Sequence, residues 1–104
     1  MQIPKKVRIG GIDYKVIHKP NPVSGENAVC YGVFDSERCE IQLNSERDMH
    51  PDRQGITFLH ELLHGAIFEC GIESDDEEKL VNTMARGLYQ IIKDNPKIFE
   101  PVKK

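Results

Sequence analysis

Apolar side chains recur at every second position in much of the first 44 residues, which is the period of a β-strand. The segment VRIGGIDYKVI predicts a hairpin that turns at Gly10 and Gly11, because a two-residue turn favours glycine at both central positions. In this register Ile9 lies opposite Ile12, and Arg8 meets Asp13 on the solvent face. The residues expected on the buried face are Val7, Ile9, Ile12, Tyr14 and Val16.

A second hairpin is predicted from VCYGVF and CEIQLN, which flank the loop Asp35–Arg38. Its predicted register places Phe34 opposite Cys39 and Cys30 opposite Leu43, so these two cysteines lie too far apart for a disulfide. With Cys70, they are expected to be reduced thiols. Positions 39, 41 and 43 should face the core, and positions 40, 42 and 44 the solvent. The two hairpins together predict a small antiparallel sheet.

From Pro51 the apolar period becomes that of an α-helix ending at Gly71. This helix should be central, because its apolar residues cover more than one face: Phe58, Leu59, Leu62, Leu63, Ala66 and Ile67. A second helix is expected up to Pro96, with Ser74 as N-cap and Glu77 as its capping-box partner. Its predicted inward stripe is Val81, Met84, Ala85, Leu88, Ile91 and Ile92, and the tail should fold back through Ile98 and Phe99.

The expected fold class is therefore α+β, with two hairpins packed on a central helix and a second helix. A chain of 104 residues corresponds to one domain, residues 1–104. The net charge of -3, with scattered Lys and Arg, argues against direct binding of nucleic acid. No secretory signal and no run of membrane-spanning length is recognisable, so we expect a cytoplasmic protein without membrane contact.

The predicted central helix contains the pattern H-E-x-x-H at residues 60–64. Its i, i+4 spacing places His60 and His64 on one helix face, where both imidazoles can bind one zinc ion at about 2.0 to 2.1 Å. Glu61 is placed to reach a metal-bound water without ligating the metal, as a general base would. The alternative is two histidines that are held in the core by hydrogen bonds and bind no metal.

A catalytic zinc needs a third protein ligand and an open position. No histidine follows His64, and Cys70 points away from it, so the candidates are the acids that open the second helix. Glu77 is expected in the capping box, whereas Glu78 shares a stripe with core residues. We favour Glu78 as the ligand, with Glu77 as the alternative. Asn82, one turn beyond Glu78, is a candidate to orient a ligand.

The segments LHELLHG and EEKLVNTMARGLYQII resemble the small HExxH-and-Glu zincins of the ImmA/IrrE type, including compact, minigluzincin-like versions common in phage and prophage genomes. That family shows a Glu followed three residues later by Ala or Val and then Asn, which matches Glu78, Val81 and Asn82. The resemblance implies that Glu78 is the third ligand and that the strand CEIQLN lies along the substrate cleft. It also implies a prokaryotic or phage-encoded protein.

The sequence thus predicts a zinc-dependent peptidase that hydrolyses a peptide bond with a metal-bound water activated by Glu61, one zinc ion being held by His60, His64 and Glu78. Its partner would be a peptide or protein substrate, paired with the exposed edge of the second hairpin. One of the three tyrosines is a candidate donor to a tetrahedral intermediate. The alternative is a non-catalytic module in which zinc is structural and the cleft docks a protein such as a repressor.

Overall fold

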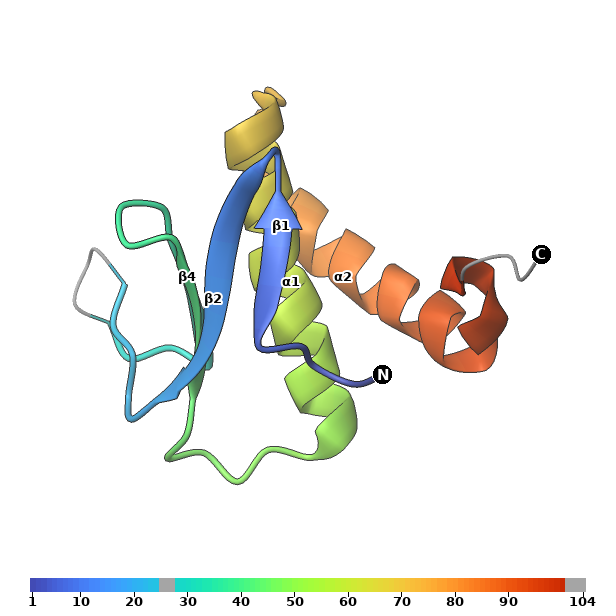
Figure 1. Cartoon of the computed structure of the whole chain (residues 1–104), viewed down its shortest axis with the longest axis horizontal. Helices are drawn as coiled ribbons and strands as arrows, with labels where there is room; N and C mark the ends of the chain where they lie inside the picture. Colours follow the sequence, from blue (N-terminus) through green and yellow to red (C-terminus); the bar gives the residue numbers. More distant parts are fainter. Residues whose placement is uncertain (25–27, 101–104) are drawn as a thin grey trace.

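The first half of the chain forms a four-stranded sheet and the second half forms two helices, of which the first packs on the sheet, and this confirms the α+β class (Figure 1). The computed structural model describes residues 1–24 and 28–100. The strands follow the order β1-β2-β4-β3 across the sheet, so β1 and β3 are its edges. Their bounds are β1 (Lys6–Ile9), β2 (Ile12–Lys19), β3 (Gly32–Asp35) and β4 (Glu40–Asn44).

The sheet is mixed, so the expectation of an antiparallel sheet was wrong in one pair of strands. β1 and β2 are antiparallel, as are β3 and β4, but β2 and β4 run parallel. Each hairpin is local in the sequence and was predictable. The direction in which one hairpin docks on the other depends on the path of the intervening loop, and the alternation of apolar residues contains no information about it.

The first hairpin has the predicted register, with Val7 opposite Tyr14 and Ile9 opposite Ile12. Gly10 and Gly11 both adopt positive φ, at 56° and 84°, as the two-residue turn requires. Tyr14 is fully buried, and its hydroxyl donates a hydrogen bond to Glu69 Oε1 at 2.7 Å. Ile12 is the exception to the predicted core face, because it lies beside the turn and is exposed.

The second hairpin is displaced from the predicted register. Phe34 lies opposite Ile41 instead of Cys39, and the four-residue loop runs from Ser36 to Cys39. The Asp35 carboxylate accepts a hydrogen bond from the Arg38 N–H at 3.0 Å, and Cys39 adopts a φ of 53°. Cysteine gives no sequence signal for a left-handed turn residue, which explains the error. All three cysteines are free thiols, as expected.

β4 is an interior strand, and both of its faces are covered. Gln42 and Asn44, expected to face solvent, are each only 3% exposed. The Asn44 side chain accepts a hydrogen bond from the Asn21 N–H at 3.1 Å and donates one to the Cys30 carbonyl at 3.0 Å. These bonds to the loop that follows β2 compensate the burial of the amide.

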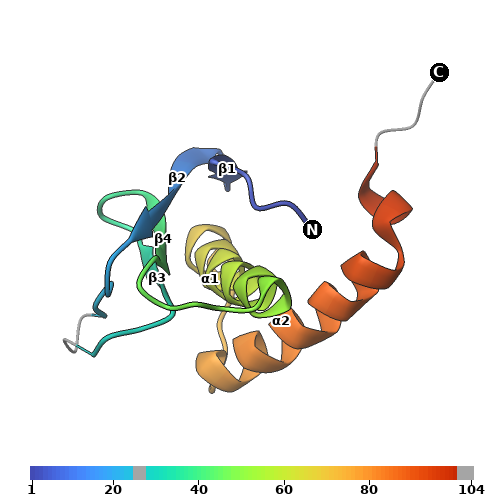
Figure 2. The same cartoon turned by 90° about the horizontal axis from the view of Figure 1, so that it is seen from below.

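Helix α1 (Pro51–Cys70) lies between the sheet and helix α2 (Glu77–Asp94), as Figure 2 shows in a view close to the α1 axis. Toward the sheet α1 packs Phe58 into the main core, and toward α2 it packs Leu59 against Ala85 and Tyr89. The prediction of a central helix ending at Gly71 is confirmed. No helix within the described residues is both long and apolar enough to span a membrane.

Helix α2 begins differently from the prediction. Its N-cap is Asp76, whose side chain accepts a hydrogen bond from the Lys79 N–H at 3.1 Å, and not Ser74. Asp76 is an equally good capping residue that lies two positions later, and the sequence alone does not rank the two. The predicted capping box of Ser74 and Glu77 is therefore not formed.

The buried stripe of α2 consists of Val81, Ala85 and Tyr89, while Met84 and Ile91 are exposed, contrary to the prediction. The helix has two neighbouring apolar stripes, and only packing against α1 decides which is covered. The tail forms a short 3₁₀ helix, η1 (Pro96–Phe99), and the exposed side chains of Ile98 and Phe99 do not fold back onto the core. Residues 101–104 of that predicted tail lie outside the described residues.

The two helices run in opposite directions along each other. At the start of α1, Asp52 accepts hydrogen bonds from the Tyr89 hydroxyl at 2.6 Å and from Lys93 Nζ at 3.0 Å, both near the end of α2. Farther along α1, His64 lies beside the first residues of α2. The start of α2 is therefore held beside the H-E-x-x-H segment.

Candidate metal centre

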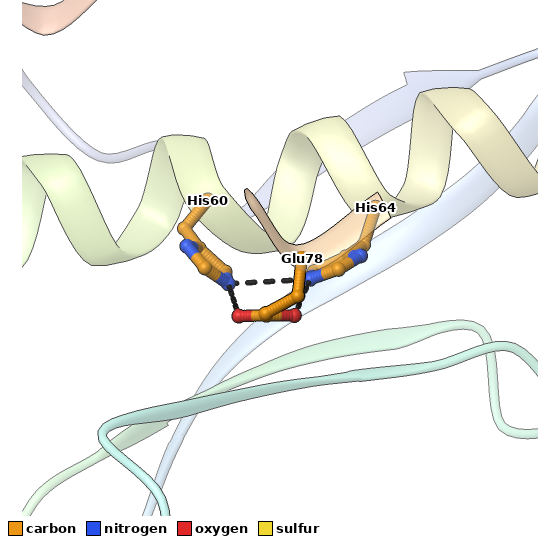
Figure 3. A group of neighbouring side chains, drawn as sticks. All are labelled: His60, His64 and Glu78. Carbon is orange, nitrogen blue, oxygen red and sulfur yellow. Dashed lines mark hydrogen bonds and ion pairs between the residues drawn. The ribbon is translucent and has the colours of Figure 1, made fainter. Parts of the chain in front are cut away.

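His60 and His64 lie one helical turn apart on α1, and their imidazoles point to the same side (Figure 3). The two Nε2 atoms are 3.2 Å apart, and each side chain is 17% exposed. The sequence pattern therefore gives the pair of converging nitrogens that it predicted.

Glu78 reaches this pair from α2 (Figure 3). Its Oε1 lies 2.9 Å from His60 Nε2 and its Oε2 lies 3.0 Å from His64 Nε2. Of the two acids considered as third ligand, Glu78 is the one that the structure groups with both histidines, and the ligand atoms all lie within 4.8 Å of one another. The choice of Glu78 over Glu77, made from the positions of the two residues on the helix, thus agrees with the group that the structure shows.

The donor set fits a divalent metal ion such as zinc. Ligand atoms at about 2.0 to 2.1 Å from a tetrahedral zinc are roughly 3.3 Å from one another, close to the distances found here. Two imidazole nitrogens and one carboxylate are ligand types that zinc accepts. Within residues 1–24 and 28–100 this group has three members and no fourth His, Cys, Asp or Glu. That number leaves a position open for water or substrate.

Glu77 has a role that the sequence did not indicate. Its Oε2 lies 2.6 Å from His64 Nδ1, the ring nitrogen that faces away from Glu78. A carboxylate on the second nitrogen of a metal-binding histidine fixes the tautomer and the ring orientation. The assignment of Glu77 to a capping box is therefore corrected: it positions His64.

Asn82, one turn beyond Glu78 on α2, lines the cleft with His60, and its side chain acts to raise the pKa of that imidazole. This favours the role of orienting a ligand over that of a helix-surface amide. Burial lowers the pKa of His60, with a further decrease from His64, while Glu78 and Asn82 oppose the shift. The net lowering favours the neutral imidazole, which is the form that binds a metal.

Glu61 lines the same cleft as the three candidate ligands, and its side chain also lies close to Gly32 of β3. It is 8% exposed, and burial raises its pKa from 4.5 to about 7. The charge of Glu78 adds to this rise, whereas His64 and a backbone hydrogen bond with Phe34 oppose it. A carboxyl group with a pKa near neutrality can both accept and return a proton.

A cleft of about 890 Å³ opens over the three ligands and is bounded by β3, α1 and α2. The strand that lines it is β3, not the strand 39–44 that the family resemblance implied. β4 is paired on both sides, so it has no free edge to which an extended peptide could pair. β3 is an edge strand with one unpaired side. This side is the exposed edge of the second hairpin, to which we expected an extended substrate to pair.

Gly32 is a further residue of the site that we missed. A Cβ atom at this position would lie 2.8 Å from Thr57 Cγ2 and 3.1 Å from Glu61 Cγ. Only glycine therefore lets β3 approach the part of α1 that contains the candidate base. A glycine inside the strand pattern CYGVF was the available signal, because glycine within a strand often marks close backbone approach.

Of the three tyrosines considered as donors to an intermediate, Tyr31 lines the cleft. Tyr14 and Tyr89 are buried and donate to Glu69 and Asp52. Tyr31 is 53% exposed, with the Arg47 guanidinium 5.4 Å from its ring centre.

No protein-family model, curated protein or solved structure matches the chain.

Proposed function

We propose that the chain is a zinc-dependent peptidase whose metal ligands are His60, His64 and Glu78. The observation that supports this most strongly is the set of three converging ligands with an open position, next to the buried carboxyl group of Glu61. A structural zinc site would ordinarily have four protein ligands. Three ligands beside a cleft of about 890 Å³ favour a catalytic site.

Zinc bound at these ligands would lower the pKa of a water molecule and polarise the peptide carbonyl. Glu61 would accept the proton of that water and later donate it to the leaving amine. Its raised pKa in the metal-free chain would fall beside a divalent cation, which favours the carboxylate needed for the first step. Glu77 and Asn82 keep the two histidines oriented throughout.

The substrate would bind in an extended conformation along the free edge of β3. Backbone pairing to an exposed strand gives affinity with little dependence on side chains, so selectivity has to come from the rest of the cleft. Tyr31, which precedes β3 and lines the cleft, would donate a hydrogen bond to the carbonyl oxygen as negative charge develops there.

The resemblance to the compact ImmA/IrrE-type zincins supports the same proposal through LHELLHG and through Glu78, Val81 and Asn82. With it we propose a cytoplasmic, prokaryotic or phage-encoded protein that acts on a peptide or protein.

The proposal is tested by incubating zinc-loaded protein with a proteome-derived peptide library and identifying new termini by mass spectrometry. Wild type should cleave peptides, and Glu61→Gln should retain zinc but lose about 10²- to 10⁴-fold in rate, the usual contribution of a general base. Glu73→Gln, which removes an exposed carboxylate outside both helices, is the matched control and should cleave like wild type.

Two results would count against the proposal. Full zinc loading without any new terminus would favour a zinc-stabilised module that docks a protein partner. Cleavage by Glu61→Gln at the wild-type rate would remove Glu61 from the mechanism.

A further inference from the structure

The cleft has two ends of opposite charge. One end contains the three ligands, with Glu61 and Glu77 beside them. The other end is lined by Arg53 of α1 and Arg86 of α2, both exposed. Binding of a metal ion and of a peptide backbone does not require the positive charge at this second end.

The antiparallel packing of the helices brings the two arginines to the same end. Arg53 lies close to Asp52, which contacts Tyr89 and Lys93 in the second half of α2. Arg86 lies in that half, eight residues after Glu78, with Asn82 midway on the same helix face. Both arginines therefore lie two helical turns from the ligands, at about 10 Å along α1 and about 12 Å along α2.

Within the part of the chain that the structure describes, neither arginine has an anionic partner. Among the ion pairs of residues 1–24 and 28–100, none involves Arg53 or Arg86. The nearest carboxylate in sequence, Asp52, already accepts from Lys93 and Tyr89. Two guanidinium groups that face one end of a cleft without a carboxylate are available to bind one from a ligand.

We propose that Arg53 and Arg86 form a carboxylate subsite that selects the substrate of the peptidase proposed above. An extended peptide advances about 3.3 Å per residue along β3, so a distance of about 10 to 12 Å places the recognised carboxylate about three residues from the bond that is cleaved. The carboxylate comes either from an Asp or Glu side chain or from the C-terminus of the peptide, since guanidinium binds both in the same way.

The test is equilibrium binding to zinc-loaded Glu61→Gln protein, in which bound peptide is not consumed. Fluorescein-labelled heptapeptides of Ala, Val and Ser would contain one Glu, moved along the chain, and matched peptides would contain Gln. Each peptide would be made with a free and with an amidated C-terminus, which separates the two sources of the carboxylate. Fluorescence anisotropy at constant ionic strength gives the dissociation constants.

We expect one position of Glu, or the free C-terminus, to strengthen binding roughly tenfold over the neutral peptide. This preference should vanish in Arg53→Gln and in Arg86→Gln. It should remain in Arg8→Gln, which removes the same charge from the first hairpin, where Arg8 pairs with Asp13.

The subsite is wrong if Glu and Gln peptides bind equally, if no peptide binds, or if Arg8→Gln weakens the preference as much as Arg53→Gln does. The binding measurements test the subsite, whereas cleavage of peptides tests the proposed peptidase activity, so the two can fail separately. A carboxylate preference that depends on both arginines, in a protein that cleaves nothing, would establish the subsite and reject the peptidase.

Discussion

Helices α1 and α2 are joined by two polar clusters that differ in the source of their positive charge. At the start of α1, the Asp52 carboxylate accepts from the Tyr89 hydroxyl and from the Lys93 ammonium, so the cluster contains its own cation. In the middle of α1, His60 and His64 converge on Glu78. In the part of the chain that the structure describes, no lysine or arginine pairs with Glu77 or Glu78.

In the first cluster the negative charge of Asp52 is matched by a cation of the chain itself. In the second cluster the carboxylates have no lysine or arginine partner among the described residues, so a cation from outside the chain could take that place. Tyr89 and Lys93 supply donors to Asp52, as a structural contact between helices requires. In the second cluster, two ring nitrogens 3.2 Å apart share one carboxylate, and the pKa of His60 is lowered mainly by burial, so the neutral form is favoured. Such a group could hold a divalent metal ion.

The largest effect should follow removal of the carboxylate that bridges the two histidines. Glu78→Gln replaces a charged ligand by a neutral amide and should weaken zinc binding by more than the ~10- to 100-fold typical of residues behind the ligands. Competition with a chromogenic zinc chelator measures the affinity, with Glu73→Gln as control. Wild-type affinity in Glu78→Gln would exclude Glu78 as a ligand.

Glu77→Gln should weaken zinc binding less than Glu78→Gln does, because Glu77 contacts His64 and is not one of the three candidate ligands. The amide keeps a hydrogen-bond acceptor but loses the charge, and zinc affinity should fall by about 10- to 100-fold. The same chelator competition measures it. A loss equal to that of Glu78→Gln would make Glu77 a ligand, and no loss would show that its contact with His64 does not matter.

The smallest effect should follow removal of the Asp52 charge in the cluster at the start of α1. The quantity affected is the stability of the fold, and the effect should depend on pH. Hydrogen bonds from Tyr89 and Lys93 lower the pKa of Asp52 below 3.8, aided by the charges of Lys93 and His50. A carboxyl group with a lowered folded-state pKa stabilises the fold above its unfolded-state pKa, and this contribution disappears as the pH falls through the folded-state value. Asp52→Asn should therefore be less stable than wild type at pH 6.

The gap in stability should shrink as the pH falls below 3.8, in urea unfolding with a chelator present. Asp48→Asn, at an exposed position just before α1, is the control and should show no gap at either pH. Zinc affinity should be unchanged in Asp52→Asn. A pH-independent gap, or a loss of zinc affinity, would show that the two clusters are not separate.

The same contrast explains what could be predicted from the sequence. The helix 51–70, its two histidines and the grouping of Glu78 with them follow from short-range spacing, and the structure has all three, although the Glu78 side chain is 63% exposed instead of facing the core. The role of Glu77 does not follow, because Ser74 and Asp76 are both good caps. The choice between them depends on a contact with His64, 13 residues earlier in the sequence.

Long-range packing accounts for the remaining errors. Gln42 and Asn44 alternate as solvent-facing residues should, yet both are buried, and Asn44 bonds to the loop after β2. The predicted inward stripe of α2 contained Met84 and Ile91 and left out Tyr89, since periodicity alone does not rank two apolar stripes of one helix. The parallel pairing of β2 and β4 likewise depends on how distant segments dock.

The most direct test of the metal centre is anomalous scattering on both sides of the zinc absorption edge, from crystals of protein purified without added metal. We predict one peak per chain, within about 2.0 to 2.2 Å of His60 Nε2, His64 Nε2 and a Glu78 oxygen, and with no fourth protein ligand. A peak with four protein ligands would make the zinc structural. The absence of a peak at these three side chains would contradict the central claim.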